Sequence, residues 1–157
     1  MATYTGSTGI KNLRDKINRD SKRLVGNVIE GVTKLMVDES PVGEAFYPSK
    51  DGGVFNDEGD YKNSWAVGLG HVNPEVRAAD TSGSAAIAEG IIAASRYDLE
   101  DNVYITNSRD HAENVEYGWG ANPEKGWKPK EGYKVVTNNI GAAKTIVEIS
   151  ASSLANK

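Results

Sequence analysis

The chain has 157 residues, a net charge of −4 and no cysteine. This length supports one domain with its own core, and the lack of cysteine excludes disulfides, thiolate metal sites and cysteine nucleophiles. The balance of 18 Lys and Arg against 22 Asp and Glu does not support a broad electrostatic grip on nucleic acid. The sequence has neither a signal peptide pattern nor an apolar run near the roughly 20 residues that span a bilayer. We therefore expect a protein made in a cytoplasm, without membrane contact.

The N-terminal part predicts a flexible arm at residues 1–9, followed by one domain at 10–157 that begins with a long helix. The helix has apolar residues at steps of three, four or seven: Ile10, Leu13, Ile17, Leu24, Val28, Val32 and Leu35. Gly26 and Gly31 inside it predict a bend or a close helix contact, because glycine costs about 1 kcal/mol relative to alanine there. The helix should end before Pro41, since the residue ahead of a proline is disfavoured in the α region.

Residues 40–62 are crowded with Pro, Gly and Asp and predict a long loop. So long a loop is uncommon inside a compact domain, and it is typical of a binding segment. It carries Phe46, Tyr47 and Phe55. These aromatic residues either anchor another chain or fold back on their own core, and the sequence leaves both readings open.

Regular structure returns in the middle of the chain. Alternation in residues 64–72 predicts a strand with Trp65 inward. Residues 84–95 predict a short helix that places Ile87 and Ile91 on one face, capped by Ser82 or Ser84. A second strand starts at Val103. It is followed by a turn and a short helix in HAENVEYG that closes on a glycine.

A second exposed loop is predicted after Gly118, in the run WGANPEKGWKPKEGY. It carries three further aromatic candidates for an interface, Trp119, Trp127 and Tyr133. From Asn139 to the end, TIVEI favours a strand by composition, whereas the wider apolar spacing fits a helix. We predict a C-terminal helix.

Patterns for nucleotide binding and for a serine nucleophile elbow are absent from the sequence. His111 with Glu113 and Glu116 lacks the spacing of known zinc helices, and the acidic run NDEGD lacks the EF-hand pattern. We predict a protein that is not an enzyme and that uses no metal or cofactor. The alternative from another class is a small hydrolase with Asp60 and Glu116 as its carboxylates.

Four segments in this order resemble the tail-completion or neck proteins of long-tailed double-stranded DNA bacteriophages: SPVG (40–43), GDYKNSW (59–65), DTSGSAAIAEGI (80–91) and VYITNSRDHAENVEYGW (103–119). The resemblance covers residues 10 to 135. It implies structural positions rather than catalytic ones: the turn at Pro41, the core anchor Trp65, the strand-end turn at Asn107, and the helix end at Glu116 and Gly118. The chain departs from the family pattern in an insertion at 43–58 and in His111, where tyrosine is common.

The resemblance also implies an α+β fold, an antiparallel sheet packed with a long N-terminal helix and shorter helices. The expected role is a virion structural protein that forms a homo-oligomeric ring at the head–tail junction. Its partners would be copies of itself, head–tail adaptor or connector proteins, and tail terminator or tail tube proteins, while DNA passes through the lumen without specific binding. The alternative within this class is a tail terminator that caps the tail tube.

Overall fold

The computed structural model describes residues 6–42, 47–48, 54–55, 58–125 and 128–155. The helices are α1 (Gly6–Asp38), α2 (Asp60–Asn63), α3 (Ser84–Arg96), α4 (Ala112–Tyr117), α5 (Val135–Ala155) and the 3-10 turn η1 (Pro123–Lys125). The strands are β1 (Tyr47–Pro48), β2 (Val54–Phe55), β3 (Trp65–Leu69), β4 (Val103–Asn107), β5 (Gly118–Trp119) and β6 (Lys130–Glu131). This mixture confirms the predicted α+β class.

The strands form three separate antiparallel pairs within the described residues, instead of the single sheet that we expected. The pairs are β1 with β2, β3 with β4, and β5 with β6. The longest pair, β3 with β4, sets Trp65 opposite Asn107 and Leu69 opposite Val103. The other two pairs lie in the segments predicted as loops, so both loops contain short β-ladders.

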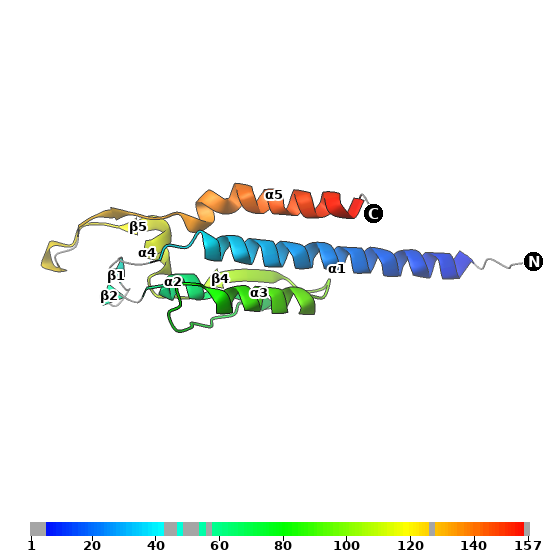
Figure 1. Cartoon of the computed structure of the whole chain (residues 1–157), viewed down its shortest axis with the longest axis horizontal. Helices are drawn as coiled ribbons and strands as arrows, with labels where there is room; N and C mark the ends of the chain where they lie inside the picture. Colours follow the sequence, from blue (N-terminus) through cyan, green and yellow to red (C-terminus); the bar gives the residue numbers. More distant parts are fainter. Residues whose placement is uncertain (1–5, 43–46, 49–53, 56–57, 126–127, 156–157) are drawn as a thin grey trace, which may run out of the picture.

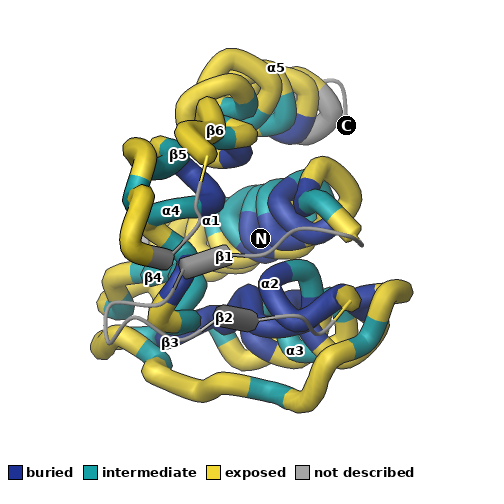
Figure 2. Tube along the Cα trace, turned by 90° about the vertical axis from the view of Figure 1, so that its left-hand side faces the viewer, coloured by how far each residue is buried: buried dark blue, intermediate teal, exposed yellow. Residues whose placement is uncertain are grey.

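The molecule is built in layers around α1. Helix α5 lies along one side of α1, while α3 and the β3–β4 pair lie along the other (Figure 1). A view along the helix axes shows α5, α1 and the α3–sheet layer stacked in that order (Figure 2). The β1–β2 and β5–β6 pairs lie at the end of the molecule opposite to the N-terminus (Figure 1).

The core lies beneath the C-terminal half of α1. The buried face of this helix carries Ile29, Thr33, Met36 and Val37, which are at most 5% exposed. These side chains pack in two clusters, one around Trp65 and the other around Val67 of β3 and Ala93 of α3. Burial of this apolar surface is the main source of stability for the layers.

Small residues set the spacing between the helices. A Cβ atom added at Gly90 of α3 would lie 2.8 Å from the Thr33 side chain, and one at Gly31 would lie 2.9 Å from Ile146 of α5. Gly26 approaches the carbonyl oxygen of Ala94 in a similar way. The predicted close helix contacts at Gly26 and Gly31 are confirmed, with α3 and with α5 respectively.

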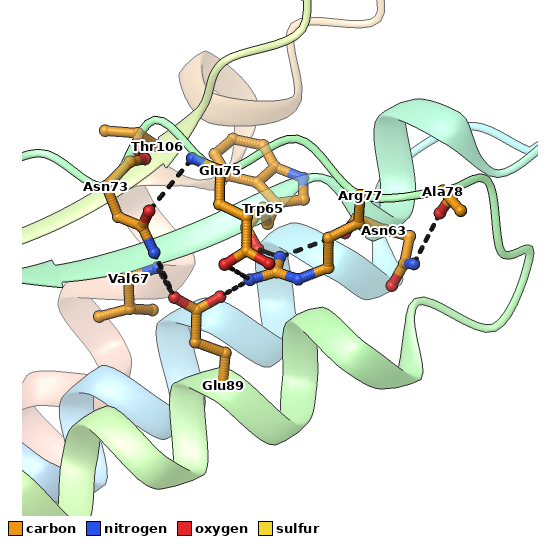
Figure 3. Close-up of polar contacts among 9 residues, drawn as sticks. All are labelled: Asn63, Trp65, Val67, Asn73, Glu75, Arg77, Ala78, Glu89 and Thr106. Carbon is orange, nitrogen blue, oxygen red and sulfur yellow. Dashed lines mark hydrogen bonds and ion pairs between the residues drawn. The ribbon is translucent and has the colours of Figure 1, made fainter.

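The free edge of β3 is covered by side chains instead of another strand (Figure 3). Arg77 donates to the carbonyl oxygen of Trp65 at 2.8 Å, and Glu89 accepts from the backbone N–H of Val67 at 3.3 Å. Arg77 and Glu89 also form an ion pair with each other. Exposed strand edges attract other chains, and these contacts satisfy the edge within the molecule.

The long N-terminal helix differs from the prediction in where it begins and in the exposure of its first apolar residues. It begins at Gly6, so residues 6–9 of the predicted arm are helical. Only the part from Leu24 onward is covered, whereas Ile10, Leu13 and Ile17 are 71%, 59% and 55% exposed. Periodicity identified the helix correctly, but it could not show that neighbouring helices end before its first turns.

Helix α3 differs from the prediction in its cap and in its buried face. Gly83, with a left-handed backbone, is its N-cap, and Ser82 contributes only an acceptor for the N–H of Ser84 at 3.2 Å. The buried residues are the small ones, Ala86, Gly90 and Ala93, while Ile91 and Ile92 are exposed. The close approach of α1 selects small side chains for this face.

The predicted C-terminal helix is confirmed as α5. It starts at Val135, four residues before the expected position. Its buried side is lined by residues such as Ile146 and Ser150, which face α1.

We expect Gly90→Ala to destabilise the protein by roughly 1–3 kcal/mol, because the added methyl group would overlap the Thr33 side chain, which is fully buried on α1. The matched control is Gly141→Ala in α5, where an added Cβ meets nothing within 4 Å. That change should stabilise the protein by up to about 1 kcal/mol. Urea unfolding of the two variants checks this, and equal stabilisation in both would contradict the packing described here.

Candidate functional site

The segment from Val103 to Trp119 joins β4, α4 and β5. Asn107 ends β4 as predicted for a turn residue. Its side-chain amide donates to the carbonyl oxygen of Tyr61 at 2.8 Å, and its Oδ1 accepts from the N–H of Arg109 at 3.3 Å. Asn107 thereby ties the end of the strand to α2.

Glu116 holds the N-terminus of α5. Its carboxylate accepts the backbone N–H groups of Val136 and Thr137, both at 2.9 Å, and the Thr137 hydroxyl at 2.6 Å. A helix N-terminus has unsatisfied N–H groups and a positive dipole end, so a carboxylate is stabilising there. Burial opposes ionisation of Glu116, but these hydrogen bonds outweigh it and lower its pKa.

Gly118 lets the chain reverse its direction immediately after α4. Its φ of 82° lies in the region that favours glycine, and an added Cβ would lie 2.2 Å from the carbonyl oxygen of Lys130. The reversal pairs Gly118 with Glu131 in the β5–β6 ladder. It also lets the N–H of Tyr133 donate to the carbonyl oxygen of Val115 at 2.7 Å, which leads the chain into α5.

The two other motif residues lie where α1 meets β3. Trp65 is 3% exposed and donates from Nε1 to the hydroxyl of Ser40 at 2.8 Å. Ser40 in turn donates to the carbonyl oxygen of Met36 at 2.6 Å, at the end of α1. Pro41 follows directly and is half-buried. The SPVG turn and the first strand are therefore joined by the indole ring.

Asp60, one carboxylate of the hydrolase alternative, is 3% exposed and forms an ion pair with Arg109. The same arginine donates from Nε to the hydroxyl of Ser64 at 2.9 Å. The second carboxylate, Glu116, is 6% exposed and caps α5. Both groups are thus engaged in structural contacts and are shielded from a substrate.

His111 is buried at the start of α4. Burial, with a smaller contribution from Arg109 and against an opposing one from Asp110, lowers the pKa of His111 to about 4, so the ring is neutral at pH 7. Its centroid lies 6.3 Å from that of Tyr61. Burial, together with the nearby Glu116 carboxylate, raises the pKa of Tyr61. Across the described ranges no three His, Asp or Glu residues gather as metal ligands would.

The predicted aromatic interface is described only in part. Trp119 is half-buried and packs against the core cluster around Trp65, whereas Tyr133 is 42% exposed. Lys130 lies between them, with Nζ 5.7 Å from the Trp119 ring centroid and 5.1 Å from that of Tyr133. Each such cation–π contact contributes about 0.5–1 kcal/mol at an exposed site.

The remaining aromatic candidates lie in the two predicted loops, which the structure describes only in part. Phe46 and Trp127 fall outside the described residues, as do Asp51, Asn56 and Asp57 of the acidic stretch. Tyr47 and Phe55 are described as backbone only: they pair across β1 and β2, and β1 contacts α4. Strand β1 of the first aromatic loop therefore lies next to α4, and the second aromatic loop follows α4 in the chain.

The sequence reasoning missed Tyr117, which is 70% exposed at the end of α4. A helical wheel of HAENVEYG could have found it, because Tyr117 lies about 200° from the buried Val115. It also did not predict that several apolar residues on two helices are exposed. These are Ile10, Leu13 and Ile17 on α1, and Val136, Ile140, Val147 and Ile149 on α5.

Long apolar helices of the kind that cross a bilayer do not occur in the part of the chain that the structure describes.

We expect Glu116→Gln to destabilise the protein by roughly 1–3 kcal/mol at neutral pH, because the amide cannot accept all three hydrogen bonds as a carboxylate does. The folded-state pKa of Glu116 lies below its ordinary value of 4.5. Its contribution is therefore complete above about pH 5.5 and is lost as pH falls below 4.5.

Thermal unfolding of wild type and Glu116→Gln from pH 7 to pH 3 measures this difference. Glu113→Gln is the matched control, since Glu113 is an exposed carboxylate on the same helix. A gap between wild type and Glu116→Gln that persists unchanged at pH 3 would show that the capping charge is not its cause.

Comparison of the chain with protein-family models, with curated proteins and with solved structures finds no match. The roles given to the residues of this site rest on the contacts described above.

Proposed function

We propose that this chain is a structural subunit of a phage virion, which assembles as a ring at the head–tail junction and joins the head to the tail through protein contacts. The observation that carries the proposal is the placement of exposed apolar and aromatic surface at both ends of an elongated subunit. One end carries Tyr117 and Tyr133, and the other carries the uncovered start of α1 (Figure 1). A ring subunit that also binds another assembly needs one surface for its neighbours in the ring and a second surface for the partner protein.

The residues of the phage-like motifs support the same proposal, because the contacts that they make are structural. Asn107, Glu116 and Gly118 shape the path from β4 through α4 to α5, and Trp65 joins α1 to β3. All of these contacts serve to build a subunit. The hydrolase alternative loses support, since Asp60 and Glu116 are buried in an ion pair and a helix cap.

The exposed apolar residues favour an oligomer over a monomer. Val136, Ile140 and Val147 lie on one side of α5 and are 42%, 64% and 42% exposed, and Ile10 of α1 is 71% exposed. Soluble monomers rarely leave large apolar patches uncovered, and such patches mark contacts with other chains. In a ring, each subunit offers one patch to each neighbour, which covers both.

Removing this protein from the phage that encodes it should leave filled heads and complete tails unjoined. Electron microscopy of lysates checks this outcome, and supplying the protein in trans should restore joined particles. Joined particles in its absence would contradict the proposal. Tails of uncontrolled length would instead favour the tail terminator, which copurification with tail tube protein would support.

The aromatic end can be tested by variants that leave the fold intact. Tyr117→Ser with Tyr133→Ser should reduce the yield of joined particles by about tenfold or more, because exposed aromatic residues contribute much of the energy of an interface. Val72→Ser is the matched control, an apolar residue that is 50% exposed on the turn after the far end of β3. Equal titres for the double variant and the control would show that this end does not contact a partner.

A further inference from the structure

The first turns of α1 project beyond the rest of the molecule (Figure 1). Every residue from 8 to 19 is exposed, and we call this stretch the α1 extension. At 1.5 Å per residue it is about 18 Å long. Its base is marked by the ion pair of Lys22 with Asp98, at 3.1 Å, just beyond the end of α3. A helix of this length is marginal in water by itself, and it gains stability from a surface that covers it.

The α1 extension is amphipathic and basic. Ile10, Leu13 and Ile17 form its apolar stripe, with exposed fractions above one half. Arg14 and Lys16 flank this stripe on its two sides, and Asp15 lies on the opposite face of the helix. Four of the 18 basic residues of the chain lie in this stretch, but only one of its 22 acidic residues. The extension therefore carries a charge of +3, and the remaining chain carries −7.

These charges decide against pairing between two α1 extensions. Pairing along the apolar stripes would bring Arg14 and Lys16 of one helix next to the same residues of the other. Like charges beside a helix–helix seam oppose association, whereas opposite charges select the partner. The stripe needs a surface that is both apolar and acidic.

The chain itself carries such a surface where α3 turns into β4. Ile91 and Ile92 are each 47% exposed, and Leu99 is 36% exposed. Three carboxylates follow within four residues, in the order Asp98, Glu100 and Asp101. We call this surface, residues 91–101, the α3 corner; with Arg96, which is also exposed, its net charge is −2. The Lys22–Asp98 ion pair shows that a basic side chain of α1 already binds there within one molecule.

We propose that the α1 extension of one subunit docks on the α3 corner of a second copy of this chain. The apolar stripe covers Ile91, Ile92 and Leu99, and the flanking basic residues pair with Glu100 and Asp101. A subunit cannot make this contact with itself, because its own extension is a continuous helix that leads away from its own corner. The inference rests on the ring assembly proposed above, and it names one contact between neighbours.

Charge exchange tests the contact in the purified full chain. The extension variant is Arg14→Glu with Lys16→Glu, and the corner variant is Glu100→Lys with Asp101→Lys. Sedimentation velocity over a concentration series should show that wild type self-associates and that each variant does so about tenfold more weakly. An equimolar mixture of the two variants should regain association, because the exchanged charges attract again.

The matched control is Lys128→Glu with Lys144→Glu, which makes the same charge change on exposed residues outside both surfaces. It should associate as wild type does. Circular dichroism and thermal unfolding should show that all variants keep their helices.

Any of three results would overturn the contact. One is a wild-type protein that stays monomeric up to its solubility limit, including the case in which it instead binds vesicles of anionic lipid. The second is an extension variant that associates as the control does, and the third is a mixture that fails to recover. A monomeric protein that still joins heads to tails would overturn this contact and leave the proposed function standing. If the subunits associate through the corner but removal of the gene causes no joining defect, the contact stands and the proposed function is overturned.

Discussion

Helix α1 is packed on two opposite sides at once, and the rest of the structure depends on how closely its neighbours approach. Gly90 of α3 lies against Thr33, and Ile146 of α5 lies against Gly31, at separations that leave no room for an additional methyl group. Interiors packed to this density transmit small changes in side-chain volume to the whole layer. The position of α3 in turn sets Glu89, whose carboxylate completes the edge of β3 with Arg77 (Figure 3). The packing of α1 therefore fixes the positions of both α3 and the β3–β4 pair.

The second constraint is the carboxylate of Glu116, which links the sheet layer to α5. Helix α5 contacts α1 along its length, but its start is positioned by Glu116 and by the reversal at Gly118. This explains why a glutamate and a glycine two residues apart belong to one structural unit. Glu116 lies in the last turn of α4 and caps the start of α5, whereas Gly118 lets the chain between the two helices turn back on itself. Both tasks are structural, which agrees with a subunit built for assembly.

The sequence predicted most of the regular elements, because each has a local pattern. The strand from Trp65, the strand from Val103, the short helix ending at Gly118 and both long helices all follow from periodicity and capping residues. The contacts between elements did not follow. The exposure of Ile10 and Ile17 depends on where α3 and α5 end, and the burial of Ala86 and Gly90 depends on how near α1 lies.

The site was predictable to a similar degree. Resemblance to the phage proteins singled out Glu116 and Gly118, but the partner of the carboxylate, the start of α5, lies twenty residues further along the chain. No spacing rule connects the two. The acidic α3 corner and the basic α1 extension were both visible in the sequence as charge, yet only the arrangement of layers shows that one projects away from the other.

We propose that this chain forms part of the head–tail junction. Electron cryomicroscopy of the intact particle tests it most directly, because a helix of 33 residues beside one of 21 gives a recognisable shape in a density map. The claim predicts a ring of these subunits between the head and the tail, with α1 extensions reaching neighbouring copies. Density for this fold in another part of the particle, or its absence from the particle, would contradict the claim.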